Sequence, residues 1–142
     1  MKITVAGAGY VGLSLSVLLS KKYQVIAYDI DQKKINLINS RKSPFIDKEI
    51  KEHFLNKKLN LEATYDKKKA FKDAAYIIVA TPTNYDQLTR SFDTSSVESV
   101  IFDAIKLNDK ANIVIKSTIP FGFTDKIKKK FNYSKIFFRL SF

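Results

Sequence analysis

The sequence of 142 residues contains no cysteine, no tryptophan and a single histidine, His53. Without cysteine the chain can form no disulfide, no thiolate metal site and no cysteine nucleophile. One histidine makes a histidine-based zinc site or a Ser-His-Asp triad implausible. His53 lies beside Phe54 on a polar helical pattern and is interpreted as an ordinary half-exposed side chain. We therefore expect no metal site, and any chemistry must come from hydroxyls, carboxylates, lysines or a bound cofactor.

Long apolar stretches are also missing. The hydrophobic residues make up 45% of the chain, but they fall in runs shorter than the roughly 18 residues of a membrane span. The N-terminus becomes glycine-rich at Gly7, too early for the apolar region of a signal peptide. We expect a cytoplasmic protein with no membrane partner. A chain of this length closes one core rather than two, so residues 1–142 are predicted to form one domain.

Arginine is scarce, since only Arg41, Arg90 and Arg139 occur among the 25 basic residues that give the chain a formal charge of +11. Basic proteins gain affinity for nucleic acids by releasing counterions from phosphate groups. Recognition of base edges, however, relies heavily on the guanidinium fork that lysine lacks. Much of the charge lies in the lysine triplets 67–69 and 128–130, which are typical of solvated helix faces. We expect no nucleic-acid partner, and an anionic small ligand or a lysine-rich surface explains the charge equally well.

Short apolar segments alternate along the chain with segments that repeat apolar residues at helical spacing. The predicted strands are 2–6, 24–28, 61–64, 76–80, 112–115 and 136–138, and the predicted helices are 10–20, one from 31 onwards, 47–56, 66–71, 94–107 and 123–131. The segment 84–92 is interpreted as a polar loop. This alternation predicts an α/β fold of the Rossmann type, with a doubly wound, mostly parallel sheet and helices on both faces.

Two of the predicted helices begin at an aspartate. Asp31 and Asp66 are expected to accept hydrogen bonds from the first free amides of the helices that follow them. In the 47–56 helix, Ile50, Phe54 and Leu55 are expected to lie on one buried side.

A glycine turn stands between the first strand and the first helix. Gly7 permits the tight turn, Gly9 lets backbone approach a diphosphate, and Gly12 lets the helix lie close to the strand. The helix N-terminus offers free amides and a partial positive charge to that diphosphate. Asp29 ends the second strand, 17 positions after Gly12, where it can accept hydrogen bonds from the adenosine ribose. The alternative is a glycine-rich turn with no ligand.

The acidic side chain also bears on which dinucleotide is bound. A carboxylate at Asp29 favours NAD over NADP, because a 2′-phosphate would meet a like charge. Lys33 and Lys34 weaken that preference, since a lysine near the ribose could attract such a phosphate.

Hydroxyl side chains follow two of the later buried strands. Thr81 and Thr83 follow the 76–80 strand, and Ser117 and Thr118 follow the 112–115 strand. In a doubly wound fold, ligands lie at the carboxyl ends of the strands. The alternative is that these residues only form turns and caps beside the prolines that stop the strands.

Four separated segments carry more specific motifs. They are Gly-Ala-Gly-Tyr-Val-Gly-Leu-Ser at 7–14, Ala-Thr-Pro-Thr-Asn-Tyr-Asp at 80–86, Phe-Asp-Thr-Ser-Ser-Val-Glu at 92–98 and Ile-Lys-Ser-Thr-Ile-Pro-Phe-Gly-Phe-Thr at 115–124. Together they resemble the NAD-binding domain of UDP-glucose 6-dehydrogenases, in the UDP-glucose/GDP-mannose dehydrogenase family. The resemblance covers residues 1 to about 137.

The resemblance implies which residues contact NAD. The matching positions are Gly7, Gly9, Tyr10, Val11, Gly12, Asp29, Lys34, Thr83 and Thr118. Tyr10 and Val11 would contact the diphosphate through their backbone, and Lys34 would lie on the adenosine side. Thr118 would also act as an accessory catalytic residue that helps to position a water or an oxyanion.

The resemblance also implies an activity that this chain would not carry out alone. Family members oxidise UDP-glucose to UDP-glucuronate with two molecules of NAD, and the second oxidation proceeds through a cysteine thioester. The sequence lacks cysteine, and the family's central helix and UDP-sugar-binding domain are expected to be absent. In the full-length family these parts bind UDP-glucose and form a homodimer. A domain for GDP-mannose or an N-acetylated UDP-sugar, a non-catalytic NAD-binding module and a basic nucleic-acid-binding domain remain as alternatives.

The last residues depart from the family pattern. Family members continue from this strand into Phe-Ser-Pro-Glu-Phe-Leu-Arg, whereas this chain reads Ile-Phe-Phe-Arg-Leu-Ser-Phe over 136–142. In one coding of the family segment, two extra thymines shift the frame so that it encodes these residues and then a stop. We expect residues from about 138 to 142 to be an out-of-frame tail, and the absence of family sequence downstream in a shifted frame would refute this hypothesis.

Overall fold

Parallel pairing joins the predicted strands into one sheet in the computed structural model, which describes residues 1–55 and 58–139. The strands are β1 (Lys2–Ala6), β2 (Gln24–Tyr28), β3 (Leu61–Thr64), β4 (Tyr76–Val79), β7 (Asn112–Ile115) and β8 (Ile136–Phe138), and the helices are α1 (Tyr10–Leu19), α2 (Gln32–Asn39), α3 (Lys48–Leu55), α4 (Lys67–Phe71), α5 (Ser95–Leu107) and α6 (Phe123–Phe131). The sheet order is β3-β2-β1-β4-β7-β8, with every neighbouring pair parallel. The order reverses between β1 and β4, so a ligand crevice is expected at their carboxyl ends. The predicted doubly wound fold is confirmed.

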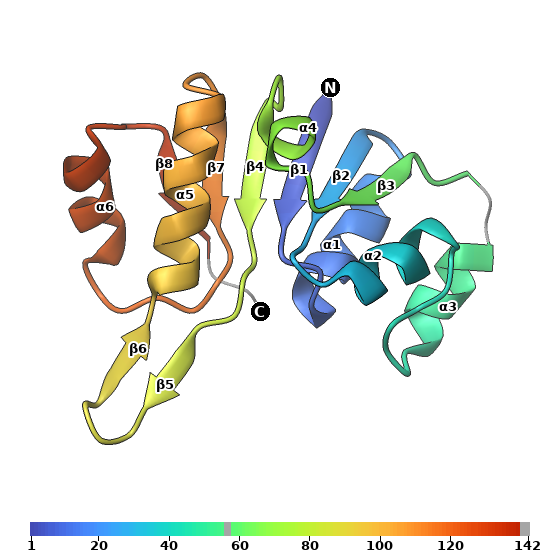
Figure 1. The fold of residues 1–142 in the computed structure, drawn as a ribbon, viewed down its shortest axis with the longest axis horizontal. Helices are drawn as coiled ribbons and strands as arrows, with labels where there is room; N and C mark the ends of the chain where they lie inside the picture. Colours follow the sequence, from blue (N-terminus) through green and yellow to red (C-terminus); the bar gives the residue numbers. More distant parts are fainter. Residues whose placement is uncertain (56–57, 140–142) are drawn as a thin grey trace.

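Two apolar clusters fill the two sides of this sheet. One joins α4, α5 and α6 to the first face and fully buries Phe71, Ile101 and Ile127. The other joins α1, α2 and α3 to the opposite face and fully buries Leu13 and Ile38. Figure 1 shows α4 and α5 in front of the sheet. Helices therefore lie on both faces, as the sequence predicts.

The predicted aspartate caps are present. Asp31 Oδ1 accepts hydrogen bonds from the amides of Lys33 and Lys34 at 3.0 and 3.4 Å. Asp66 accepts the equivalent pair at the start of α4, at 3.0 and 3.3 Å. Each cap satisfies amides that have no acceptor within the helix, which is how these short helices begin at fixed residues.

The prediction that 84–92 is a loop is wrong. The segment forms most of a β-hairpin, in which β5 (Asn84–Asp86) pairs antiparallel with β6 (Ser91–Asp93). The rings of Tyr85 and Phe92 pack across it with centroids 5.1 Å apart. Figure 1 shows the hairpin projecting from the body of the domain. The three-residue strands are mostly exposed, so they lack the alternation of buried and polar residues by which a strand is recognised in sequence.

The side predicted for α3 is partly wrong. Ile50 and Phe54 are buried as expected, but Leu55 is 80% exposed. Successive residues turn by about 100° around a helix, so Leu55 lies well away from the side that Ile50 and Phe54 share. Residue 56 of the predicted helix and residues 140–142 of the predicted tail lie outside the described residues.

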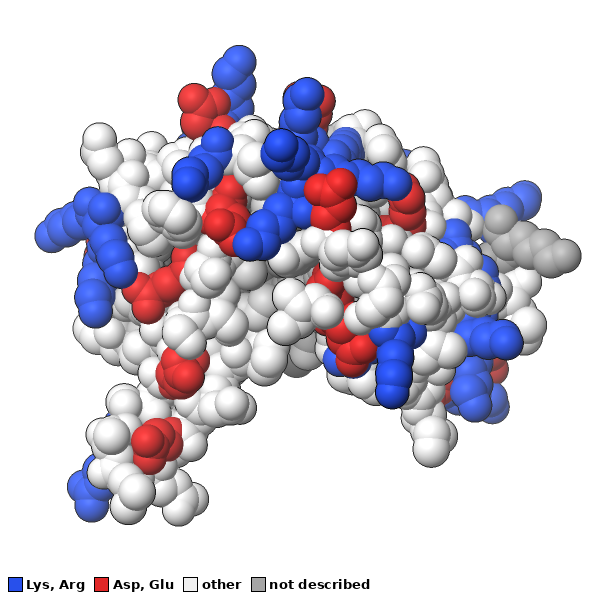
Figure 2. Space-filling view, in the orientation of Figure 1, with Lys and Arg blue, Asp and Glu red and all other residues white. Residues whose placement is uncertain are grey.

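Charged side chains are spread over the surface. Lys67, Lys68 and Lys69 are exposed, as predicted, and the ammonium of Lys67 lies 3.0 Å from the Asp103 carboxylate. Figure 2 shows several separate groups of basic side chains with acidic side chains among them. Such interspersed charge is typical of a solvated surface. In the described part of the chain, no helix combines the length and the apolar character needed to cross a membrane.

Candidate functional site

The turn from β1 to α1 needs glycine at its first position. Gly7 has φ of +105°, and a Cβ there would lie 2.5 Å from the carbonyl oxygen of Ala80. Its amide donates to the carbonyl of Tyr28 at 2.8 Å, which ties the turn to the end of β2. Both the left-handed conformation and the close approach to Ala80 exclude a side chain.

Gly12 and Gly9 differ in what a side chain would meet. A Cβ on Gly12 would lie 1.8 Å from the carbonyl oxygen of Gly7, so the packing of α1 on the turn demands glycine. A Cβ on Gly9 would meet no atom within 4 Å, and Gly9 has an ordinary φ of −72°. Neither backbone strain nor internal packing explains Gly9. The space in front of it is what the close approach of a ligand to the backbone requires.

Backbone amides face this space at the start of α1. The first hydrogen bond of the helix runs from the Leu13 amide to the Gly9 carbonyl at 2.9 Å. The amides of Tyr10, Val11 and Gly12 therefore precede the helical hydrogen-bond pattern. The N-cap residue, Gly9, offers no capping side chain, and the first turn carries no acidic residue. An anion at this position would accept hydrogen bonds from these amides and would be attracted by the positive end of the helix dipole.

The Asp29 carboxylate is fixed beside the same turn. Its Oδ2 accepts a hydrogen bond from the Ala8 amide at 2.7 Å, and its Oδ1 accepts one from the Asp31 amide at 2.8 Å. A carboxylate has about four lone-pair sites, so two of them remain for further donors. The half-buried carboxylate lies next to the free amides of α1, where it could accept hydrogen bonds from the two hydroxyls of a ribose. The predicted residues of the turn and Asp29 are thus brought together.

Tyr10, Val11 and Lys34 are the other residues predicted to contact the cofactor on this side of the domain. The side chains of Tyr10 and Val11 are 59% and 46% exposed and contribute little to the core. Their predicted contact with the cofactor is through their backbone amides. Hydrogen bonding to the Asp47 carboxylate, together with its charge, raises the pKa of Tyr10 above its usual range. Lys34 lies in the first turn of α2, and its ammonium is 5.5 Å from the centroid of the Phe45 ring.

The predicted hydroxyl residues meet at the carboxyl ends of β4 and β7. Thr83 Oγ1 donates a hydrogen bond to the Thr118 carbonyl oxygen at 2.7 Å. Ser117 is buried and its hydroxyl donates to the Thr81 carbonyl at 2.6 Å, so its role here is to join the two strand ends. Sequence reasoning did not single out Ser96, whose hydroxyl donates to the Pro82 carbonyl at 2.7 Å. The sequence predicted that Ser96 lies in the first turn of a helix, but it did not predict the contact with the segment that follows β4.

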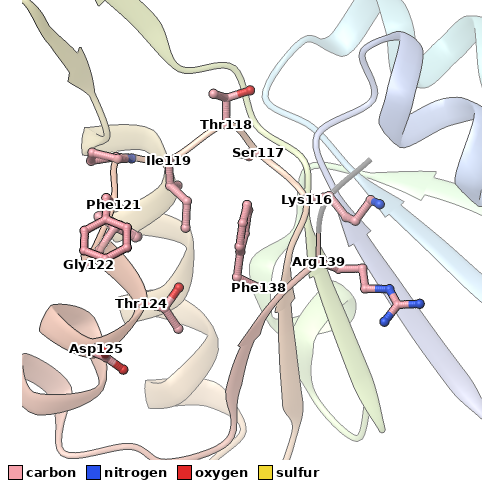
Figure 3. Close-up of a pocket in the computed structure, with 12 residues that line it drawn as sticks. Lys116, Ser117, Thr118, Ile119, Phe121, Gly122, Thr124, Asp125, Phe138 and Arg139 are labelled. Carbon is pink, nitrogen blue, oxygen red and sulfur yellow. The ribbon is translucent and has the colours of Figure 1, made fainter. Parts of the chain in front are cut away.

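A separate cleft of about 560 Å³ lies between the β7–α6 segment and the end of β8. Figure 3 shows Thr118 at one border of this cleft and the Phe138 ring between the two walls. Ile119, Phe121 and Thr124 also line it. The cleft does not include the glycine turn. We take the turn as the centre of the candidate site, because the fixed carboxylate of Asp29 lies beside the free amides of α1 there.

Comparison with known proteins identifies the family of the chain. Residues 1–138 match the family described as "UDP-glucose/GDP-mannose dehydrogenase family, NAD binding domain". The UDP-glucose 6-dehydrogenase of Streptococcus pneumoniae is 49% identical over 142 residues, which are all of this chain and 36% of the relative. The UDP-glucose 6-dehydrogenase of Campylobacter jejuni subsp. jejuni serotype O:2 is 45% identical over 144 aligned residues, covering 100% of this chain and 37% of that relative. The chain thus spans little more than a third of the relatives' length.

A solved structure agrees on the fold. The structure of GDP-mannose dehydrogenase from Pseudomonas aeruginosa superposes with a TM-score of 0.86, covering 100% of this chain and 36% of that one. At 24% identity this likeness bears on the fold alone. Since the family match extends over nearly the whole chain, the protein belongs to the UDP-glucose/GDP-mannose dehydrogenase family, of which it comprises the NAD-binding domain.

Proposed function

We propose that this chain binds NAD at the glycine turn, as the cofactor-binding part of a UDP-glucose 6-dehydrogenase. The observation that carries the proposal is the open space at Gly9, which lies beside the free α1 amides and the fixed carboxylate of Asp29. The family match and the 49% identity to the Streptococcus pneumoniae relative support the same function.

Each predicted residue has a role in this arrangement. Gly7 and Gly12 hold the turn, and Gly9 leaves room for the diphosphate, which accepts hydrogen bonds from the amides of Tyr10 and Val11. Asp29 accepts hydrogen bonds from the ribose hydroxyls. The remaining predicted contacts are Lys34 on the adenosine side, and Thr83 and Thr118 at the carboxyl ends of β4 and β7.

We infer the activity of the whole protein from its family. Bound NAD would supply the hydride acceptor for the two oxidations at the C6 carbon of UDP-glucose that, with one water, give UDP-glucuronate. The residues of this chain bind and orient the cofactor, and Thr118 helps to position a water or an oxyanion. The sequence has no cysteine to form the thioester, so we expect no UDP-glucose-dependent NADH formation from this chain alone. A homodimer built around a central helix remains a prediction for full-length members of the family.

Substrate choice within the family is the second question. A GDP-mannose or an N-acetylated UDP-sugar dehydrogenase would use the same cofactor domain. The likeness to the Pseudomonas aeruginosa structure concerns the fold and does not distinguish these substrates. The higher identity to UDP-glucose 6-dehydrogenases favours UDP-glucose. Since NAD and nucleotide sugars are cytoplasmic solutes, the proposed function implies a cytoplasmic protein.

Calorimetric titration with NAD and with NADP tests the cofactor proposal. We expect saturable binding of NAD and at least about tenfold weaker binding of NADP, because Asp29 repels a 2′-phosphate. A folded chain that gives no heat with millimolar NAD would overturn the proposal. Tighter binding of NADP than of NAD would refute the role given to Asp29.

A further inference from the structure

The position of the Lys34 ammonium bears on which dinucleotide the chain prefers. A carboxylate at Asp29 repels a 2′-phosphate, but a lysine in the first turn of α2 could offset that repulsion. In the structure, the ammonium of Lys34 lies 5.5 Å from the centroid of the Phe45 ring. A ring face attracts a cation within about 6 Å of its centroid. Phe45 therefore competes with a bound cofactor for the same ammonium.

The Phe45 ring is held in place by its packing and by its backbone. It is half-buried and packs against the apolar cluster under α1, α2 and α3. The Ser43 hydroxyl accepts a hydrogen bond from the Phe45 amide at 3.1 Å and donates one to the Phe45 carbonyl at 2.7 Å. The same carbonyl accepts a hydrogen bond from the Asp47 amide at 3.0 Å. The ring is therefore a fixed surface on which a flexible lysine side chain lies.

The backbone of Lys34 is fixed as well. Its amide donates to Asp31 Oδ1 at 3.4 Å, within the cap that starts α2. The Asp31 amide in turn donates to Asp29 Oδ1 at 2.8 Å, so the start of α2 is tied to the carboxylate that is proposed to bind the ribose. Since both ends of this link are fixed, only the flexible side chain of Lys34 decides where its charge lies relative to Asp29.

An aromatic ring holds the ammonium without neutralising it. Within residues 1–55 and 58–139, no ion pair joins Lys34 to an acidic side chain. A cation–π contact at a partly exposed site corresponds to roughly two- to fivefold in an equilibrium constant. The lysine thus keeps its full charge and is held by a contact whose loss would be measurable in a titration.

We propose that Phe45 is a specificity-determining residue for the cofactor, because its ring keeps the Lys34 ammonium away from the position of a 2′-phosphate. Asp29 then repels NADP without compensation. The inference rests on the proposed function, since it concerns the choice between NAD and NADP at the same site. Without the ring, the ammonium is released and can pair with the 2′-phosphate, so the preference for NAD falls.

Calorimetry gives the ratio of the dissociation constants of NADP and NAD. Phe45→Leu keeps an apolar side chain but removes the ring, and we expect the ratio to fall about threefold or more. Phe45→Tyr keeps the ring and should retain the parent ratio. Phe102→Leu is the matched control, because the Lys106 ammonium lies 5.1 Å from the centroid of the Phe102 ring on α5, which packs on the opposite face of the sheet. This control should also retain the parent ratio.

Lys34→Met tests the other partner of the contact. If the ring already keeps the ammonium away from the 2′-phosphate, removing the charge should change the ratio by no more than about twofold at physiological salt. In the Lys34→Met background, Phe45→Leu should have no further effect on the ratio, because no ammonium remains to be released. A general disturbance of packing by Phe45→Leu would instead change the ratio in both backgrounds.

NMR detects the contact without any cofactor. The side-chain protons next to the Lys34 ammonium should show an upfield ring-current shift in the parent and in Phe45→Tyr, and this shift should be lost in Phe45→Leu. Circular dichroism verifies that each variant is folded, and Lys34→Met decides the question if Phe45→Leu is not.

Three results would overturn the inference. They are the absence of the ring-current shift in the parent, an unchanged ratio in folded Phe45→Leu, and a ratio that rises more than about twofold in Lys34→Met, which would show that Lys34 already attracts NADP. A folded parent chain that binds neither dinucleotide refutes the proposed function and this inference with it. NAD binding with an unchanged ratio in Phe45→Leu refutes this inference alone.

Discussion

The glycine turn after β1 and the cleft beside β8 lie at the same edge of one sheet, but they are built from different groups. The turn presents backbone amides whose positions are fixed by close contacts at Gly7 and Gly12. The cleft presents side chains, and two of them, Phe121 and Phe138, are 107% and 42% exposed. The domain therefore fixes the candidate site at the turn through backbone geometry, whereas the cleft is shaped by exposed side chains. Some substitutions in the turn should therefore lower the stability of the fold, and others should weaken NAD binding alone.

The largest effect is expected for Gly12→Ala. The new Cβ would lie 1.8 Å from the backbone oxygen of Gly7, and neither atom can move without shifting α1 or the turn. We expect the free energy of unfolding to fall by about 3 kcal/mol or more, or the chain to fail to fold. Urea denaturation followed by circular dichroism measures this. A variant as stable as the parent would show that the turn is not fixed by this contact.

Gly9→Val should have the opposite profile. A side chain at Gly9 meets no protein atom within 4 Å, so the free energy of unfolding should change by no more than about 1 kcal/mol. The isopropyl group would fill the space proposed for the diphosphate, and we expect NAD affinity to fall by about a hundredfold or more. Urea denaturation and calorimetry on the same sample test both parts. Unchanged NAD affinity would move the proposed diphosphate away from Gly9.

Asp29→Asn is expected to act on binding with a smaller factor. The amide keeps one acceptor oxygen but loses the charge, and charge-assisted hydrogen bonds contribute roughly 1.5–3 kcal/mol each. We expect calorimetry to give roughly 10- to 100-fold weaker NAD binding and a smaller difference between NAD and NADP. Asp31→Asn is the control, since that carboxylate caps α2 instead of facing the turn. Equal effects of the two substitutions would contradict the role given to Asp29.

The parts predictable from sequence are those with local signals. The glycine turn and the caps at Asp31 and Asp66 lie within a few residues of the features that reveal them. Asp29 is more distant, but its spacing from the turn is part of the motif. The sheet follows from alternating strands and helices, because parallel strands need long crossovers. The candidate site at the turn and its dinucleotide ligand were therefore predictable from the motif, whereas the roles of Lys34, Thr83 and Thr118 were assigned only through the resemblance.

The parts that escaped prediction depend on contacts between distant residues. The Thr83 hydroxyl meets a carbonyl 35 positions away, and the Ser96 hydroxyl contacts a carbonyl 14 positions before it. Such pairs become visible only when the order of the strands is known. The β5–β6 hairpin was missed because its short exposed strands bury no regular face.

Thr83→Val tests the hydrogen bond that joins the segments following β4 and β7. Valine keeps the shape of the side chain but cannot donate to the Thr118 carbonyl. A neutral hydrogen bond contributes about 1 kcal/mol, so we expect roughly fivefold weaker NAD binding in calorimetry. Thr89→Val is the control, because Thr89 lies at the tip of the hairpin and contacts Ser91. Similar changes in both variants would argue for a general effect on the hairpin.

The smallest effect concerns pH and Tyr10. Hydrogen bonding to Asp47 raises the pKa of Tyr10 in the folded chain. The unfolded pKa is about 10, so this contribution to stability is complete below about pH 10 and is lost as the pH rises through the folded pKa. Urea midpoints measured from pH 8 to pH 11 should therefore fall slightly less steeply for Tyr10→Phe than for the parent. Because the Tyr10 side chain is mostly exposed, the difference should be small and should shrink in high salt. If both chains gave parallel curves at low and at high salt, the hydrogen bond would contribute nothing to the stability of the turn.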